Sequence, residues 1–330
     1  MNYDVLVVGN PLMDQLAFAD DATLQETGVV PGSMSLVGMP DISRLTELTG
    51  DVVMAPGGSE TNTAVGIAEF GGTVKLLGAL ADDDLGVRYR ADLAKYSNID
   101  ADFTVYPSSE YGAGTGTSLV LVSPDGERTM LTYLGASSLL ESRCIDKAAE
   151  DAAKAVYFDA YLLDLAAGEE IVAELLSYAE ANSAKIVFGL ADVNAVGRHH
   201  DTIVDLAAKA DILLANETEI KALAGVSDPL QAVEKSAHFL SQAAVTLGEK
   251  GALLYDQGSF IFLDALSADK LVDTTGAGDQ FAAGICFGTA RGIALKDSAV
   301  MGMAAASEVI SHMGARPTPG WATFLRAAGS

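Results

Sequence analysis

The residues best suited to chemistry are concentrated in one glycine-rich heptapeptide, Asp-Thr-Thr-Gly-Ala-Gly-Asp, at positions 273–279. A strand-like segment at 270–272 precedes it, and a run of small residues with helical periodicity follows it. Gly276, Ala277 and Gly278 leave the backbone N–H groups of a helix start uncovered, and the helix dipole adds positive potential there. The segment is therefore predicted to bind an anion such as a phosphate group.

Asp279 falls in the first turn of the predicted helix, beside this anion hole. The helix dipole and the nearby N–H groups favour its ionised form. An ionised carboxylate in that place can accept the proton of a substrate hydroxyl as a general base. A glycine-rich turn capped by an aspartate is the structural alternative, and the complete heptapeptide favours phosphate binding over it.

A second glycine-rich segment, Gly-Gly-Ser-Glu-Thr-Asn-Thr-Ala, occupies positions 57–64. Gly57 and Gly58 allow a ligand to approach the backbone closely, and Asn62 can both donate and accept hydrogen bonds. Asp14 follows the first predicted strand, and the carboxyl ends of strands in open α/β sheets face the ligand crevice. Its carboxylate can accept two hydrogen bonds from a sugar diol. A capped loop and a turn cap are the structural alternatives.

A third segment lies in the turn between the predicted strands 243–247 and 252–255. Thr246, Gly248 and Gly251 place a hydroxyl and two glycines at a strand end, which suits nucleotide phosphates. A β-hairpin turn explains the same residues equally well.

A fourth segment follows the predicted strand 211–215. Asn216 and Glu219 offer hard oxygen atoms that can order a hydrated Mg²⁺, since this ion prefers oxygen ligands and keeps several waters. A helix capping box with Asn216 at the N-cap and Glu219 at N3 is the structural alternative.

The elements that must position these residues follow an α/β pattern. Short apolar runs alternate with helix-period segments, which predicts βαβ units and a mostly parallel sheet covered on both faces. The predicted strands are 5–8, 74–77, 155–158, 185–190, 211–215 and 243–247. The predicted helices are 61–70, 85–96, 169–181, 202–208, 217–223, 230–241, 278–291 and 295–313.

Two regions break this alternation. Residues 14–55 contain scattered Gly and Pro and little helical periodicity, and residues 102–135 have the pattern of a β-meander. Strands at 117–122 and 128–133 flank a turn at 123–127. We expect these regions to form a small β-sheet lid that projects from the core, with two surface loops as the alternative. The core domain would then comprise residues 1–13, 56–101 and 136–330, and the lid domain residues 14–55 and 102–135.

Composition excludes several classes of protein. The 330 residues carry a formal net charge of −25, which argues against binding to nucleic acid or an anionic membrane. Cys144 and Cys286 are too few for a disulfide scaffold and are expected in the core. The sequence has neither a P-loop motif nor a Gly-x-Gly-x-x-Gly motif after the first strand. With no basic leader and no long apolar run, a cytoplasmic protein is expected.

Taken in order, these motifs resemble the ribokinase-like (PfkB) family of carbohydrate and nucleoside kinases, from Val5 to about Pro317. The resemblance implies a three-layer α/β/α domain with a small β lid. Catalysis would then rest on the base Asp279 and the anion hole of Gly276, Ala277 and Gly278. The nucleotide and Mg²⁺ would be contacted by Thr246, Gly248, Gly251, Asn216 and Glu219. The hydroxyl groups of the acceptor would be contacted by Asp14, Gly57, Gly58 and Asn62.

Within the family, the segments at 9–14, 114–117, 211–219 and 273–279 are most similar to adenosine kinases. The resemblance implies ATP- and Mg²⁺-dependent phosphorylation of the primary hydroxyl of a ribose-containing substrate, adenosine first, with a ribokinase- or fructokinase-type activity as the alternative. A nucleotide-binding protein without catalytic activity is a further alternative. The presence of Asp279 beside the anion hole argues against it, because such a protein needs no general base. A monomer or homodimer with a small-molecule partner is expected.

Arg128, near the tip of the lid, could meet the transferring phosphoryl group or be a solvated turn residue. A flat apolar slot for a purine would draw on residues of the first strand end, the lid and the segment after 158. The candidates are Leu12, Met34, Leu36, Leu119, Leu121 and Tyr161.

Overall fold

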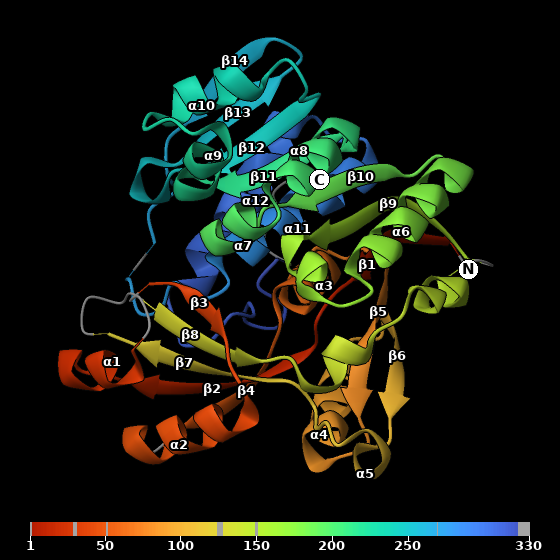
Figure 1. Ribbon diagram of the computed structural model, residues 1–330. Coiled ribbons are helices and arrows are strands. Elements are labelled where there is room, and N and C mark those ends of the chain that lie inside the picture. The colour runs from red at the N-terminus through yellow and green to blue at the C-terminus, as the bar shows by residue number, and fades with distance from the viewer. Residues whose placement is uncertain are drawn as a thin grey trace.

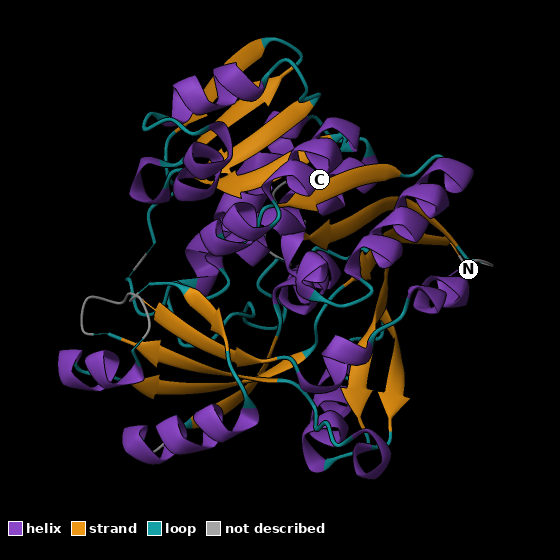
Figure 2. Cartoon of the chain, in the orientation of Figure 1, coloured by secondary structure: helices purple, strands orange, loops and turns teal. Residues whose placement is uncertain are grey.

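The computed structural model describes residues 2–28, 32–50, 52–123, 128–148, 151–268 and 270–322. Its strands form two sheets, one of nine strands and one of five (Figures 1 and 2). The predicted turn at 123–127 lies outside the described residues except for Ser123. No helix in the described ranges is long and apolar enough to cross a membrane.

The large sheet has the order β14-β13-β12-β11-β10-β9-β1-β5-β6. All neighbours from β12 to β6 are parallel, and β13 and β14 continue the sheet antiparallel. The mostly parallel sheet predicted from the sequence is confirmed. The strands are β1 (Asn2–Val8), β5 (Val74–Ala81), β6 (Ile99–Tyr106), β9 (Ala152–Asp159), β10 (Lys185–Gly189), β11 (Ile212–Asn216), β12 (Gln242–Thr246), β13 (Ala252–Asp256) and β14 (Ser259–Leu263).

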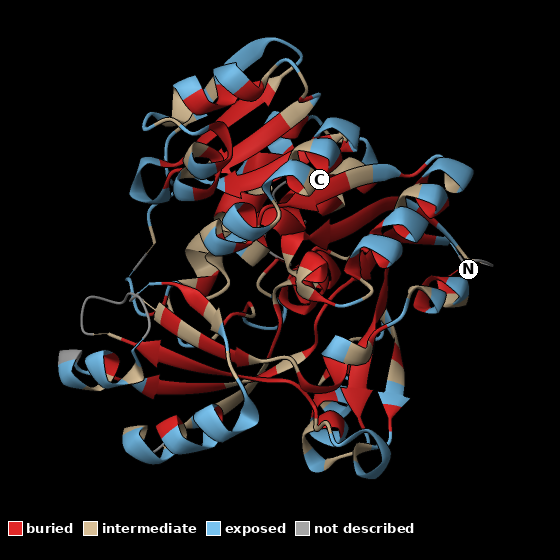
Figure 3. Cartoon of the chain, in the orientation of Figure 1, coloured by how far each residue is buried: buried red, intermediate tan, exposed pale blue. Residues whose placement is uncertain are grey.

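Helices cover both faces of this sheet, so that the strands are buried between them (Figure 3). One face is covered by α3 (Ser59–Glu69), α4 (Asp84–Leu93), α11 (Ala277–Arg291) and α12 (Leu295–Val309). The other is covered by α6 (Gly168–Asn182), α7 (Val193–Arg198), α8 (His200–Lys209), α9 (Glu217–Ala224) and α10 (Pro229–Ser236). Short helices are α5 (Ser108–Tyr111), η1 (Gly135–Leu139), η2 (Ser142–Ala148), η3 (Ala160–Asp164) and η4 (Gly248–Lys250). Both cysteines are buried in the core, as predicted.

The small sheet has the order β3-β8-β7-β2-β4 and projects from the α/β body in Figure 1. Its strands are β2 (Leu12–Phe18), β3 (Met34–Leu36), β4 (Val53–Gly57), β7 (Thr117–Val122) and β8 (Arg128–Tyr133). The predicted small second sheet is therefore present, and β7 and β8 form the predicted antiparallel pair.

Two helices in the first lid segment were not predicted. They are α1 (Asp21–Thr27) and α2 (Met39–Thr49), and α2 buries Ile42 and Leu45 against the small sheet. The scattered glycines that suggested irregular structure mark the helix ends, because Gly28 and Gly50 are the C-caps of α1 and α2. Glycine is common at helix C-termini because it adopts the backbone conformation that ends a helix.

The lid boundary at residue 102 was also predicted wrongly. β6 pairs in parallel with β5 along its whole length and belongs to the large sheet. An edge strand alternates buried and exposed residues, so its pattern resembles a strand of the small sheet. At the other boundaries β2 begins at Leu12 and β4 ends at Gly57, each about two residues beyond the expected limits.

The strand predicted at 270–272 is a loop. Leu271 is 68% exposed and Val272 is 38% exposed, so this apolar segment is not part of the core. Its anchor is a backbone hydrogen bond from Val272 N–H to the Ile310 carbonyl, 2.9 Å long, at the end of α12.

The sequence analysis placed Leu119 and Leu121 of β7 on the ligand side of the small sheet. Leu119 and Leu121 are fully buried in the cluster beneath α1 and α2, whereas Ser118 and Val120 face the cavity on the other side. Leu119 and Leu121 therefore do not line a substrate slot, contrary to the prediction. The physical reason is the missed pair of helices, which gives the second face of the small sheet its own core.

We expect Leu119→Ala to destabilise the protein without weakening acceptor binding. Removing a fully buried leucine side chain usually costs about 2–5 kcal/mol of unfolding free energy. Because Leu119 faces α2, the KM for the acceptor should stay within about twofold of the parent value. Denaturant unfolding and steady-state kinetics measure the two effects, and a large rise in KM at unchanged stability would contradict the face assignment.

Candidate active site

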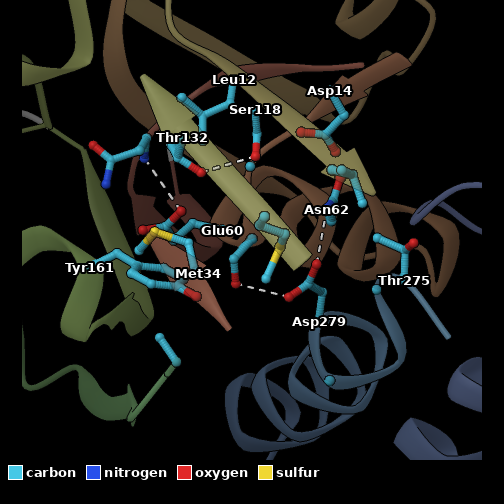
Figure 4. A pocket seen from close by; sticks show the side chains of 18 of the residues that line it. Leu12, Asp14, Met34, Glu60, Asn62, Ser118, Thr132, Tyr161, Thr275 and Asp279 are labelled. Atoms are coloured by element: carbon cyan, nitrogen blue, oxygen red, sulfur yellow. Dashed lines mark hydrogen bonds between the residues drawn. The ribbon is translucent and has the colours of Figure 1, made fainter. Parts of the chain in front are cut away.

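The centre of the site is the carboxylate of Asp279 in the first turn of α11. Ser59 Oγ donates to its Oδ1 at 2.8 Å, and Asn62 Nδ2 donates to its Oδ2 at 2.9 Å (Figure 4). Both donors come from the first turn of α3. The two glycine-rich segments, more than two hundred residues apart, thus meet at one carboxylate. Ser59 was not singled out in the sequence, although it lies inside the second motif.

Burial raises the pKa of Asp279. The hydrogen bonds from Asn62 and Ser59 and the positive charge of Arg128 oppose this rise but do not cancel it. The expectation that the helix start would favour the ionised form is therefore wrong in its net direction. A carboxyl group with a raised pKa is the stronger base once it is ionised.

The predicted anion hole forms the start of α11. Gly276 is its N-cap with a positive φ of 77°, and a Cβ there would lie 2.3 Å from the Ala315 carbonyl oxygen. Only glycine fits this position, because both the conformation and the space exclude a side chain. At Gly278 a Cβ would meet no atom within 4 Å, so the first turn of the helix is open on that side.

The buried carboxylate of Asp273 organises the loop before this helix. It accepts hydrogen bonds from the backbone N–H of Thr275 at 3.1 Å, from Thr275 Oγ1 at 2.8 Å and from the backbone N–H of Gly314 at 2.8 Å. The first residue of the heptapeptide is therefore structural, whereas the last one, Asp279, lines a cavity.

Arg128 is neither solvated nor free. Its guanidinium forms an ion pair with Asp273, and only 11% of its side chain is exposed. Burial lowers the pKa of Arg128 to about 10, so that the side chain is still cationic at neutral pH. Because Arg128 begins β8, this pair joins the small sheet to the anion loop.

A cavity of about 340 Å³ lies between the carboxyl ends of the large-sheet strands and the inner face of the small sheet. Five residues predicted to contact the substrate line it together with Asp279: Asp14, Gly58, Asn62, Arg128 and Tyr161. Its apolar wall consists of Leu12, Met34, Leu36, Val120, Met130 and Leu134.

Gly57 does not line this cavity. A Cβ at Gly57 would lie 2.0 Å from Asp14 Oδ2, so the missing side chain makes room for the Asp14 carboxylate. The Gly57 carbonyl accepts a hydrogen bond from Tyr89 Oη at 2.6 Å. Gly57 thus makes room for Asp14, the predicted acceptor contact, and does not face the cavity itself.

The carboxylate of Asp14 points toward this cavity (Figure 4). Burial raises its pKa to about 7, and the charge of Asp279 adds to the rise while Arg316 and Arg128 oppose it. Near neutral pH Asp14 can therefore donate or accept a hydrogen bond, which suits a diol.

A second cavity, of about 620 Å³, lies on the other side of the anion loop. Thr246, Gly248 and Gly251 line it, as do Ala277 and Gly278. Its apolar walls come from Leu271, Phe281, Met303, Ala306 and Ile310. Thr274 and Gly278 line both cavities, so the anion loop is the point where the two meet.

Asn216 and Glu219 form the capping box of α9. Glu219 accepts hydrogen bonds from the backbone N–H of Asn216 at 2.9 Å and from Asn216 Nδ2 at 2.6 Å. Both residues also line a smaller cavity that Asp279 and Thr246 share. Since each oxygen of Glu219 already accepts one bond, the pair fits contact with waters on a Mg²⁺ ion better than direct coordination. Burial raises the pKa of Glu219 to about 7.

A buried pair of carboxyl groups lies near Asp279 and was missed in the sequence. Glu60 and Asp159 are each 1% exposed, and Asn10 N–H donates to Glu60 Oε2 at 3.3 Å. Burial, together with the charge of Asp159, raises the pKa of Glu60 well above its usual range. We interpret Glu60 as the protonated partner that donates to Asp159. The two residues belong to α3 and to the end of β9, and no spacing in the sequence relates them.

Comparisons with known proteins show which family and which solved structures this chain is similar to. The model of the pfkB family carbohydrate kinases matches residues 33–321. The structure of an adenosine kinase from Sinorhizobium meliloti superimposes with a TM-score of 0.93 at 34% identity and covers 99% of both chains. A probable sugar kinase from Rhizobium etli also has a TM-score of 0.93, at 31% identity, over 99% of this chain and 98% of its own. A probable fructokinase from Arabidopsis thaliana is 30% identical over 84% of this chain and 74% of its own length.

Glu60 gives rise to a pH-dependent stability. Its pKa in the folded protein lies above the unfolded value of about 4.3. Between these two values the folded state holds a proton that the unfolded state has released, so stability falls as pH rises. We expect the Tm of the Glu60→Gln variant to fall less between about pH 5 and pH 8 than that of the parent protein, because Gln can still donate to Asp159.

Thermal unfolding across this pH range measures the effect. Glu47→Gln, at an exposed position on α2, is the matched control and should retain the slope of the parent. Equal slopes for the parent and Glu60→Gln would show that Glu60 does not hold the extra proton.

Proposed function

Because the chain belongs to the pfkB family of carbohydrate kinases, whose members are phosphotransferases, we propose that it transfers the γ-phosphoryl group of ATP to the primary hydroxyl of a nucleoside, most directly adenosine. One observation carries this proposal. Two cavities, of about 340 and 620 Å³, meet at the glycine-rich start of α11, and the carboxylate of Asp279 lines the first of them beside that helix start. This arrangement suits a reaction between a small acceptor and a nucleotide phosphate.

The acceptor would occupy the cavity of about 340 Å³, with its ribose toward Asp14 and the backbone at Gly58. A primary hydroxyl on the same sugar would then point toward Asp279. Ser59 and Asn62 hold both oxygens of that carboxylate, so its orientation is fixed before the substrate arrives. Such preorganisation lowers the barrier because little reorganisation is left for the reaction step.

In the chemical step Asp279 accepts the hydroxyl proton while the hydroxyl oxygen forms a bond to the γ-phosphorus. The bond between that phosphorus and the β–γ bridging oxygen breaks, and ADP leaves with the electron pair. The proton remains on Asp279 until the product departs. Backbone N–H groups at Gly276, Ala277 and Gly278 would stabilise the negative charge on the transferring group.

The nucleotide would occupy the larger cavity beside Thr246, Gly248 and Gly251. Arg128 adds a cation at the border of the acceptor cavity, where it pairs with Asp273 and keeps the small sheet over the site. Asn216 and Glu219 would hold waters of a Mg²⁺ ion, which supplies positive charge to the phosphates when it is bound.

The choice of a nucleoside over a free sugar rests on the inner face of the small sheet. Leu12, Met34, Val120, Met130 and Leu134 offer an apolar wall that a purine ring can cover and a hexose cannot. The adenosine kinase from Sinorhizobium meliloti, which matches this chain over 99% of its length, supports the same choice. The relatives named as fructokinase and sugar kinase support a free-sugar kinase as the second candidate.

We expect Asp279→Asn to lower kcat about 10²- to 10⁴-fold while nucleotide binding changes little. The amide keeps the shape and the hydrogen bond to Ser59 but cannot accept the hydroxyl proton. Steady-state kinetics and equilibrium titration with ATP measure the two quantities. A variant that retains most of its kcat would exclude Asp279 as the base.

A substrate panel tests the acceptor. We expect adenosine to have a higher kcat/KM than ribose or fructose, because only a nucleoside covers the apolar wall. Other nucleosides should be accepted to a lesser degree, since the wall offers shape more than hydrogen bonds. A free hexose or ribose that outperforms every nucleoside would replace the nucleoside assignment by the second candidate and leave the phosphotransfer mechanism unchanged.

A further inference from the structure

Arg316 lies outside every motif in the sequence, in the segment that follows α12. Only 11% of its side chain is exposed, and its Nη1 forms an ion pair with Asp92 on α4. The guanidinium carbon lies 5.8 Å from the centre of the Tyr89 ring, within the range of a cation–π contact. Two residues of α4 thereby hold Arg316 in place.

The remaining contact of Arg316 leads into the active site. Its Nε donates a hydrogen bond to Asn62 Oδ1 at 3.3 Å. Asn62 Nδ2 donates to Asp279 Oδ2 at 2.9 Å. The amide of Asn62 therefore stands between a cation that only donates and a carboxylate that accepts.

This arrangement fixes which way the amide points. With Oδ1 toward the guanidinium, Nδ2 must face the carboxylate of Asp279. The flipped amide would place Oδ1 against a carboxylate oxygen and Nδ2 against a guanidinium N–H, and both contacts would be repulsive. Without Arg316, only the hydrogen bond to Asp279 would select the orientation of the Asn62 amide.

The cost of keeping Arg316 indicates a role in the site rather than in folding. Its Nη2 is buried and has no hydrogen-bond partner among the described residues. A buried cation with an unsatisfied donor costs stability, so a purely structural contact at this position would be better served by an apolar side chain.

We propose that Arg316 is a positioning residue that sets the orientation of the Asn62 amide and, through it, the orientation of the Asp279 carboxylate. The inference rests on the proposed role of Asp279 as the base. Arg316 does not line the acceptor cavity, so it acts on the site through residues that do. It donates a hydrogen bond to Asn62, and its charge lowers the pKa of Asp14. The double-mutant cycle below isolates the part that passes through Asn62.

The test is a double-mutant cycle with Arg316→Met and Asn62→Ala. Methionine keeps much of the length of the side chain and removes all its donors. We expect Arg316→Met alone to lower kcat about 10- to 100-fold, because a misoriented catalytic group commonly has an effect of that size. The KM for ATP should change less than about threefold. In the Asn62→Ala background the same replacement should lower kcat by less than about threefold, because the group it positions is gone.

Arg291→Met is the matched control. Arg291 also combines an ion pair, to Asp4 at 2.7 Å, with a ring contact, 5.4 Å from the Phe287 centroid, at the far end of α11. We expect this variant to leave kcat unchanged. The Tm of both variants is measured beside kcat, so that a loss of stability can be told apart from a loss of turnover.

Two results would overturn the inference. Equal losses of kcat from Arg316→Met in the parent and in the Asn62→Ala background would show that Arg316 does not act through Asn62. A loss of kcat in Arg291→Met as large as that in Arg316→Met would assign the effect to general destabilisation. Both are distinguishable from a failure of the proposed function, in which Asp279→Asn itself would remain active.

Discussion

The site depends on one buried carboxylate held by two donors from another helix. Asp279 belongs to α11, whereas Ser59 and Asn62 belong to α3, and both helices pack on the same face of the large sheet. The helices can meet closely because α3 has a glycine where they touch: a Cβ at Gly66 would lie 2.2 Å from Gln280 Oε1. The close approach of the helices brings their first turns together and places Asp279, the proposed base, at the carboxyl ends of the strands, where α/β folds bind their ligands.

The cost of this arrangement is an accumulation of buried acid groups. Burial raises the pKa of Asp279, Asp14, Glu60, Asp159 and Glu219, all within the same region. Two arginines, Arg128 and Arg316, partly offset this by lowering the pKa of Asp14, and each also contacts a residue that supports the site. In a chain with a net charge of −25, these two cations come from distant elements, one from the small sheet and one from the segment after α12.

The small sheet contributes more than a cover. Its inner face provides the apolar wall of the cavity proposed for the acceptor, and its outer face has a separate core beneath α1 and α2. Arg128 at the start of β8 connects the small sheet to the loop before α11 through its ion pair with Asp273. The same loop lies between the two cavities, so the packing of the small sheet and the geometry of the proposed phosphate site are linked through the ion pair.

The sequence by itself determined which residues could take part in catalysis or binding and how strands and helices alternate, because both depend on local composition and periodicity. It could not decide which face of β7 meets the cavity, since a period of two residues gives Leu119 and Ser118 opposite faces without saying which is inside. It also missed α1 and α2, whose caps resembled loop residues, and placed a strand at 270–272 where an apolar segment stays exposed. Only the tertiary structure brought Asn62 to Asp279, Glu60 to Asp159 and Arg316 to Asn62. Each of these contacts joins side chains separated by roughly a hundred residues or more, and their partners are selected by packing rather than by any spacing along the chain.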